Sequence, residues 1–297
     1  MDVKSLTNAI EATRVVSYVN AGCIAILFFD FFDCLDKEIR VIWMKKLNFT
    51  KIMYLLTRYS TFWEAGVVIY QLSIPGDWFN ACAVAFKLNA FLFVFGLGVG
   101  EAIMTLRTYA VWGRNPILKY GLPIFYVAVW AAGFTVTALF LSDLEFAPSP
   151  LNPYIGCYAT RTNPIIFMSW VLLLFYDAVM FVLMAIPAFK AFRSGGRSRL
   201  LTVVYRDGVL YYLYLFVISL VNILVTLLAA PDLILIFSLL SRVLHAILSC
   251  RVVLDIHELA RSQPLISPTP HARQNSVMAT APYHVRVRTI SSPKVPF

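Results

Sequence analysis

Seven apolar stretches, each about as long as a bilayer is thick, constrain this chain more than any other feature. A hydrocarbon core of roughly 30 Å needs about 20 helical residues per crossing. Each stretch is continuously apolar rather than alternating, which predicts helices and not the strands of a membrane barrel. The expected fold is therefore all-α, a polytopic bundle of seven transmembrane helices. The stretches cover approximately residues 15–34, 52–73, 83–106, 120–142, 165–189, 208–230 and 233–254.

Composition leaves no room for a separate soluble domain. Of the 297 residues, 60% are hydrophobic and only 14% are charged. The last two stretches are separated only by Ala229-Ala230-Pro231-Asp232, which we interpret as a tight hairpin because proline and a carboxylate interrupt the apolar run. We expect a short N-terminal tail at 1–14, a membrane domain at 15–254 and a tail at 255–297. This tail is rich in serine, threonine, proline and basic residues, so we expect disorder from about residue 262.

Lysine and arginine fall almost entirely on alternate connections between the apolar stretches. Of the 25 such residues, 19 lie in 35–51, in 107–119, in 190–206 and from 251 onward. Short basic loops are retained on the cytoplasmic side of a membrane. We therefore expect the N-terminus outside and the C-terminus in the cytoplasm, in the plasma membrane or another membrane of the secretory pathway.

The net charge of +9 then belongs mostly to the cytoplasmic face. Anionic lipid is the expected partner of such a face, and a cytoplasmic signalling protein is a second candidate. Positive charge that lies beside the bilayer gives no case for nucleic acid.

Two of the five cysteines fall on the predicted outer side. Cys82 opens the third stretch at its outer end, and Cys157 lies in the long outer connection 143–164. Because that side is oxidising, we expect a disulfide between them, with two free thiols as the alternative. Cys23, Cys34 and Cys250 fall within or at the ends of the apolar stretches and need only packing to explain them.

Ionisable residues inside the apolar stretches are costly unless they are paired, so they are the first places to search for function. Asp30 and Asp33 are three residues apart near the inner end of the first stretch. Arg58 enters the second stretch from the same side at a similar depth. We expect a structural ion pair between these groups, with a functional proton or ion site as the alternative.

A second set of ionisable residues lies deeper in the membrane. Arg242 and His245 share one helix face and could meet carboxylates from other helices. We expect a polar centre that locks the bundle, positions a ligand or relays protons. Its candidate members are Glu64, Glu101, Asp177, Arg242 and His245.

Enzyme chemistry has no visible signature in this chain. The pattern Gly-x-Ser-x-Gly, the pattern His-Glu-x-x-His and the phosphate-binding loop do not occur. The last apolar stretch has no lysine that could hold retinal, and His245 alone among four histidines lies in a stretch. We therefore predict neither an enzyme, a metal site nor a cofactor.

Several short runs resemble a known family. They include Leu27-Phe28-Phe29-Asp30, Leu35-Asp36-Lys37-Glu38-Ile39-Arg40-Val41-Ile42-Trp43 and Leu55-Leu56-Thr57-Arg58-Tyr59. These runs, within about 18–73, resemble an uncharacterised family of fungal integral membrane proteins that is abundant in mushroom-forming basidiomycetes. A domain of unknown function over the first two helices defines that family. The resemblance implies a seven-helix membrane protein and supplies no activity, cofactor or catalytic residue.

The tail offers candidate phosphorylation sites. Arginine stands three residues before two of the acceptors, and proline follows the other two. A phosphate there would weaken the attraction to anionic lipid. The four acceptors are Ser267, Ser276, Thr289 and Ser292.

These features lead to one functional expectation and two alternatives. The first is a protein of receptor-like organisation, in which a ligand shifts the helices and the basic inner loops engage a cytoplasmic partner. A small-solute or proton-coupled transporter that uses the polar centre is the second. A membrane scaffold or accessory protein without a ligand is the third.

Overall fold

The computed structural model describes residues 3–44, 46, 48–74, 79–113, 115–147, 158–161, 165–193, 199–228 and 236–262. Within these residues the chain forms seven α-helices, one short π-helix and two short strands. The helices are α1 (Val3–Glu38), η1 (Ile39–Trp43), α2 (Phe49–Ser73), α3 (Phe79–Val111), α4 (Pro116–Ser142), α5 (Ile166–Arg193), α6 (Arg199–Leu228) and α7 (Ser238–Ser262). The strands are β1 (Glu145–Ala147) and β2 (Tyr158–Arg161).

Five of these helices are long and apolar enough to cross a membrane, namely the continuous α1 and η1, then α3, α4, α5 and α6. The chain is therefore a multi-pass membrane protein with an all-α membrane domain, as the apolar stretches predict. Seven crossings and their sidedness stay predictions. The predicted break at 229–232 and the predicted disorder beyond 262 lie outside the described residues.

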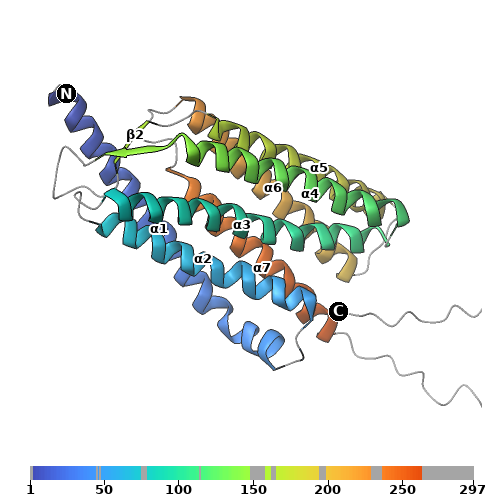
Figure 1. Ribbon diagram of the computed structural model, residues 1–297. Coiled ribbons are helices and arrows are strands. Elements are labelled where there is room, and N and C mark those ends of the chain that lie inside the picture. The colour runs from blue at the N-terminus through green and yellow to red at the C-terminus, as the bar shows by residue number, and fades with distance from the viewer. Residues whose placement is uncertain are drawn as a thin grey trace, which may run out of the picture.

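The other two long helices, α2 and α7, have 25 residues each but are more polar. Their charges inside the bundle, such as Arg58 and Glu64 on α2 and Arg242 on α7, explain this difference. Helix α7 lies in the middle of the bundle, where it packs against α1, α2, α3 and α6 (Figure 1). A helix that other helices surround does not meet the lipid, so it can carry charge that an outer helix could not.

The two ends of the bundle differ in structure. The N-terminus and the β1–β2 pair lie at one end, which we name the hairpin end (Figure 1). The strands are antiparallel, β1 packs against α3, and this small sheet is the one departure from the all-α prediction in the described residues. The C-terminal end of α7 lies at the opposite end beside η1, and we name this the η1 end.

Hydrogen bonds hold the η1-end half of α3 to α5 and α6. The hydroxyl groups of Thr108 and Tyr212 are 2.7 Å apart, and Tyr212 donates to the backbone oxygen of Met104 at 2.6 Å. Trp112 donates from Nε1 to the backbone oxygen of Leu183 at 2.8 Å. In the η1-end half of the bundle, packing and hydrogen bonds thus hold α3 to the α5–α6 pair.

Candidate functional site

Five ionisable side chains meet in the middle of the bundle, and we name them the central polar cluster. They come from α2, α3, α5 and α7, and none is more than 1% exposed. An unpaired charge that is buried this completely destabilises the protein by roughly several kcal/mol. The partners of each group therefore decide what the cluster can do. The members are Glu64, Glu101, Asp177, Arg242 and His245.

Arg242 pairs with Glu64. Its Nε lies 3.0 Å from Oε2 of Glu64, and Nη2 donates to the hydroxyl of Ser60 at 2.8 Å. A longer bond of 3.4 Å reaches the backbone oxygen of Thr57. The charge of Arg242 is therefore matched by one carboxylate, and this pair fixes α7 to α2.

Glycines on α3 make room for the groups around this pair. A Cβ atom at Gly96 would overlap the guanidinium of Arg242. The backbone oxygen of Gly98 accepts a hydrogen bond from Tyr126 of α4 at 2.8 Å. A Cβ atom at Gly100 would lie 3.3 Å from the hydroxyl oxygen of Ser249 on α7. Gly96 and Gly100 therefore share the face of α3 that α7 approaches, whereas Gly98 lies on the opposite face, toward α4.

The other three members form a separate group. Nδ1 of His245 lies 3.1 Å from Oε1 of Glu101. The carboxyl group of Asp177 lies beside that of Glu101, and both oxygens of Glu101 and Oδ1 of Asp177 have no hydrogen-bond donor among the described residues. Ser219 on α6 donates to Oδ2 of Asp177 at 2.5 Å. The structure thus divides the predicted polar centre into an ion pair, Arg242 with Glu64, and a triad of two carboxyl groups and one imidazole.

A second set of charges lies nearer the η1 end. Arg58 is 4% exposed, and its Nη1 lies 3.3 Å from Oδ2 of Asp30. Its Nε lies 2.8 Å from Oε2 of Glu38, and Nη2 donates to the backbone oxygen of Phe31 at 3.2 Å. These contacts join α1 to α2 across the bundle.

The predicted partnership of Asp33 with Arg58 needs correction. Oδ2 of Asp33 lies 2.9 Å from Nη2 of Arg251, whose Nε lies 2.7 Å from Oδ1 of Asp30. The Asp33 side chain is half-exposed and faces α7, whereas Arg58 is buried on the α2 side. We name the whole set, Asp30, Asp33, Glu38, Arg58 and Arg251, the η1-end network.

Glu38 is a central member of this network that the sequence analysis missed. Its carboxylate accepts hydrogen bonds from Tyr54 at 3.0 Å, from Tyr59 at 3.0 Å and from Trp43 at 3.1 Å. The sequence predicts a connection over 35–51, but α1 continues to Glu38 and then changes to the π-helix η1. The missed signal is spacing: Glu38 follows Asp30 by eight residues, which is about 80° around a helix, so both side chains fall within one broad buried face.

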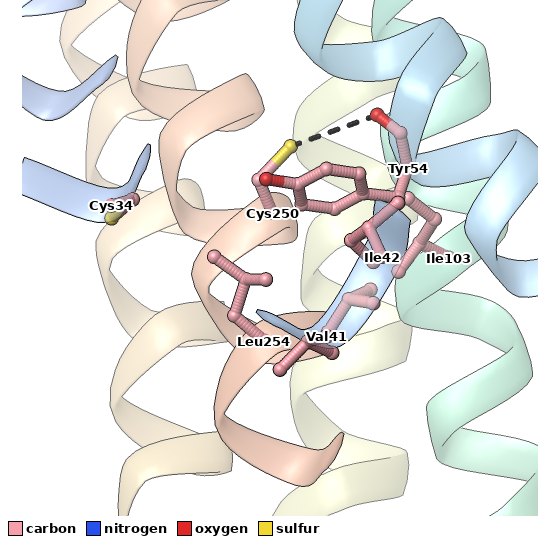
Figure 2. Close-up of a cluster of buried hydrophobic side chains, with 8 residues drawn as sticks. Cys34, Val41, Ile42, Tyr54, Ile103, Cys250 and Leu254 are labelled. Carbon is pink, nitrogen blue, oxygen red and sulfur yellow. Dashed lines mark hydrogen bonds between the residues drawn. The ribbon is translucent and has the colours of Figure 1, made fainter. Parts of the chain in front are cut away.

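Apolar side chains close the η1 end beside this network. Tyr54 packs with Ile42, Cys250 and Leu254, all of which are buried (Figure 2). The thiol of Cys250 lies 4.0 Å from the backbone oxygen of Tyr54. Lys51, which we counted among the basic residues of the first connection, is 2% exposed and donates to the backbone oxygen of Ile42 at 3.2 Å.

The remaining predicted site residues lie at the margins. Cys82 is disulfide-bonded, whereas Cys23, Cys34 and Cys250 are free. Its predicted partner, Cys157, lies outside the described residues, so that pairing stays a prediction. In the part of the chain that the structure describes, no group of three or more histidine, cysteine, aspartate or glutamate side chains could hold a metal ion. The predicted phosphorylation sites Ser267, Ser276, Thr289 and Ser292 also lie outside the described residues.

The fit between Gly96 and Arg242 predicts an effect of added volume. We expect Gly96→Ala to lower the free energy of unfolding by about 1–3 kcal/mol, because the new methyl group must displace the paired guanidinium. The control is Gly133→Ala on α4, where a Cβ atom would meet nothing. Alanine favours the helix there, so the control protein should be as stable as the wild type or slightly more stable. Thermal unfolding of the purified proteins in detergent checks this, and equal stability of the two variants would contradict it.

The contacts of Glu38 predict a large cost for losing its charge. We expect Glu38→Gln to destabilise the protein by about 3–5 kcal/mol, because Arg58 loses a buried partner. Glu258→Gln is the matched control, since Glu258 pairs with Lys37 at 3.3 Å on the surface. Exposed pairs contribute about 0–1 kcal/mol, so this control should melt nearly as the wild type does. Similar melting temperatures for both variants would show that Glu38 does not hold the network together.

One family model matches this chain. Its description is Family of unknown function (DUF6533), and it matches residues 18–63. The matched segment includes Asp30, Glu38 and Arg58, so it supplies most of the η1-end network. No curated protein matches the chain. The expected similarity to a family defined by a domain of unknown function is therefore confirmed over this segment.

Proposed function

We propose that the chain is a seven-helix membrane protein of receptor-like organisation, with its N-terminus outside and its η1 end facing the cytoplasm. A ligand from the outer side would shift α7, and this shift would open the η1 end to a cytoplasmic partner. The positive-inside distribution of lysine and arginine supports this orientation, since the basic connections belong to the η1 end.

The observation that carries the proposal is the closed η1 end. A receptor without its partner is closed at its inner face, whereas a transporter presents a hydrated path to each face in turn. Here, Arg58 and Arg251 bind three carboxylates from α1. Tyr54, Ile42 and Leu254 fill the space beside them. These contacts support a resting state that a signal has to open.

Helix α7 supplies the mechanical link. It carries Arg242 and His245 in the central polar cluster and Arg251 in the η1-end network. Nine residues separate the two arginines, which is about 13–14 Å along a helix. A rotation or translation of α7 that a ligand favours at its centre would therefore reach Arg251 directly.

Arg251 is the part of the network that gives way most easily. Its side chain is 38% exposed, whereas the side chain of Arg58 is 4% exposed. Water can replace the partners of an exposed guanidinium at little cost, but not those of a buried one. The α1–α7 contact is thus the expected gate, and the α1–α2 contact is the expected fixed support.

The native thiol of Cys250 reports on this gate. We expect Arg251→Gln to make Cys250 react about 5–30-fold faster with a membrane-impermeant maleimide, because one or two kcal/mol of lost closure changes the open population by that factor. The reaction should occur from the cytoplasmic side only, in inside-out vesicles and not in intact cells. Mass spectrometry of the peptide that contains Cys250 measures the rate.

Arg40→Gln is the matched control, since Arg40 forms an exposed pair with Asp36 and should leave the rate unchanged. An equal rate in the wild type and in Arg251→Gln would contradict the gate. A Ser249→Cys variant separates the transporter alternative. Labelling of this central position from both membrane faces would favour a transporter over a receptor.

A further inference from the structure

The central triad has a charge problem that its neighbours do not solve. Glu101, Asp177 and His245 are each 0% exposed. The positive charge of Arg242 is already matched by Glu64 at 3.0 Å. Two carboxylates that lie together in a low dielectric cannot both stay ionised without a positive charge between them.

We propose that Glu101, Asp177 and His245 form a proton-binding site in the middle of the bundle. A proton from the aqueous phase adds to a carboxylate oxygen of Glu101, and the carboxyl group that forms donates to Nδ1 of His245, which lies 3.1 Å from Oε1. No other bond breaks, and no redox partner is needed. Such a site makes the packing of α3, α5 and α7 depend on proton uptake and release.

Other polar groups around the triad are already engaged. Tyr126 of α4 donates to the backbone oxygen of Gly98, and Tyr212 of α6 donates to that of Met104. The hydroxyl of Tyr176, on α5, is hydrogen-bonded to Thr105 of α3. From α2 and α7, Glu64 and Arg242 face the same centre as a closed pair. None of these groups is available as the missing positive charge.

Hydroxyl groups on α7 mark a route to this site. Ser238, Ser241, His245 and Ser249 follow one another at spacings of three, four and four, so they share one helix face. The three serine hydroxyls are buried and have no hydrogen-bond partner among the described residues. Buried hydroxyls of this kind are satisfied by water, which can also carry protons. The stripe runs from the start of α7, at the hairpin end, to the triad and one turn beyond it.

The opposite direction is closed by apolar packing. One turn beyond the triad, α7 presents Cys250 and then Leu254 to Tyr54 (Figure 2), and Val253 belongs to the same buried cluster. On α5, the buried side chains of Met180 and Met184 follow Asp177 and fill the space between it and the η1 end. Proton exchange is therefore expected from the hairpin end alone, and the proposal does not depend on whether the protein is a receptor.

Infrared spectroscopy of the purified full-length protein at neutral pH tests the site. A protonated carboxyl group and a carboxylate have separate stretching bands. We expect the wild type to show a band from a buried protonated carboxyl group. This band should be lost or shifted in Glu101→Gln and in Asp177→Asn. It should persist in Glu258→Gln, because that carboxylate lies on the surface beside Lys37 and outside the central polar cluster.

Absence of the band from the wild type would overturn the proposal, as would a band that disappears in Glu258→Gln but survives both triad variants. Each triad variant is informative by itself, so the test stands if one of them does not fold. Transfer into heavy water measures access. We expect Ser241→Ala to slow the isotope shift of the band at least several-fold, whereas Ser73→Ala, on the exposed end of α2, should leave it unchanged. Equal rates in these two variants would overturn the α7 route.

Discussion

The free energy of placing charge in a membrane interior determines how this bundle is assembled. Every charged group in an apolar helix must find a partner or lie where protein replaces lipid. Helix α7 is surrounded by α1, α2, α3 and α6 and carries two arginines that bind carboxylates on α1 and α2. The central position of α7 and its polar composition therefore depend on each other. The charges of α7 would be too costly against lipid, and its ion pairs with α1 and α2 hold it at the centre.

This constraint also divides the bundle into two levels. At the η1 end, two arginines and three carboxylates join α1, α2 and α7, and Glu38 gathers three further hydrogen bonds. In the middle, one arginine is matched by one carboxylate, and two more carboxyl groups share a single histidine. The first level holds the helices in register, whereas the second contains two carboxyl groups, Glu101 and Asp177, for which Arg242 is not available as a partner.

Much of this arrangement could be predicted from the sequence, because hydropathy and charge are local properties. The apolar stretches indicated the helices, and buried charges such as Glu64 and Arg242 were recognisable as members of one centre. Their pairing was not predictable, because it depends on which helices are neighbours and how they are rotated. The sequence therefore predicts that Asp33 pairs with Arg58, whereas the structure places Asp33 against Arg251 of α7. Glu38 was missed because the charged run that contains it was interpreted as a connection, whereas α1 continues through Glu38 and into η1.

The most direct test of this account is a double-mutant cycle on Glu64 and Arg242, with thermal stability in detergent as the measurement. Glu64→Leu and Arg242→Met should each cost about 3–5 kcal/mol, because each leaves a buried charge without its partner. The double variant removes both charges, so it should be more stable than either single variant. If the two effects are additive, the charge on α7 is not held by this pair, and the account of the bundle is wrong.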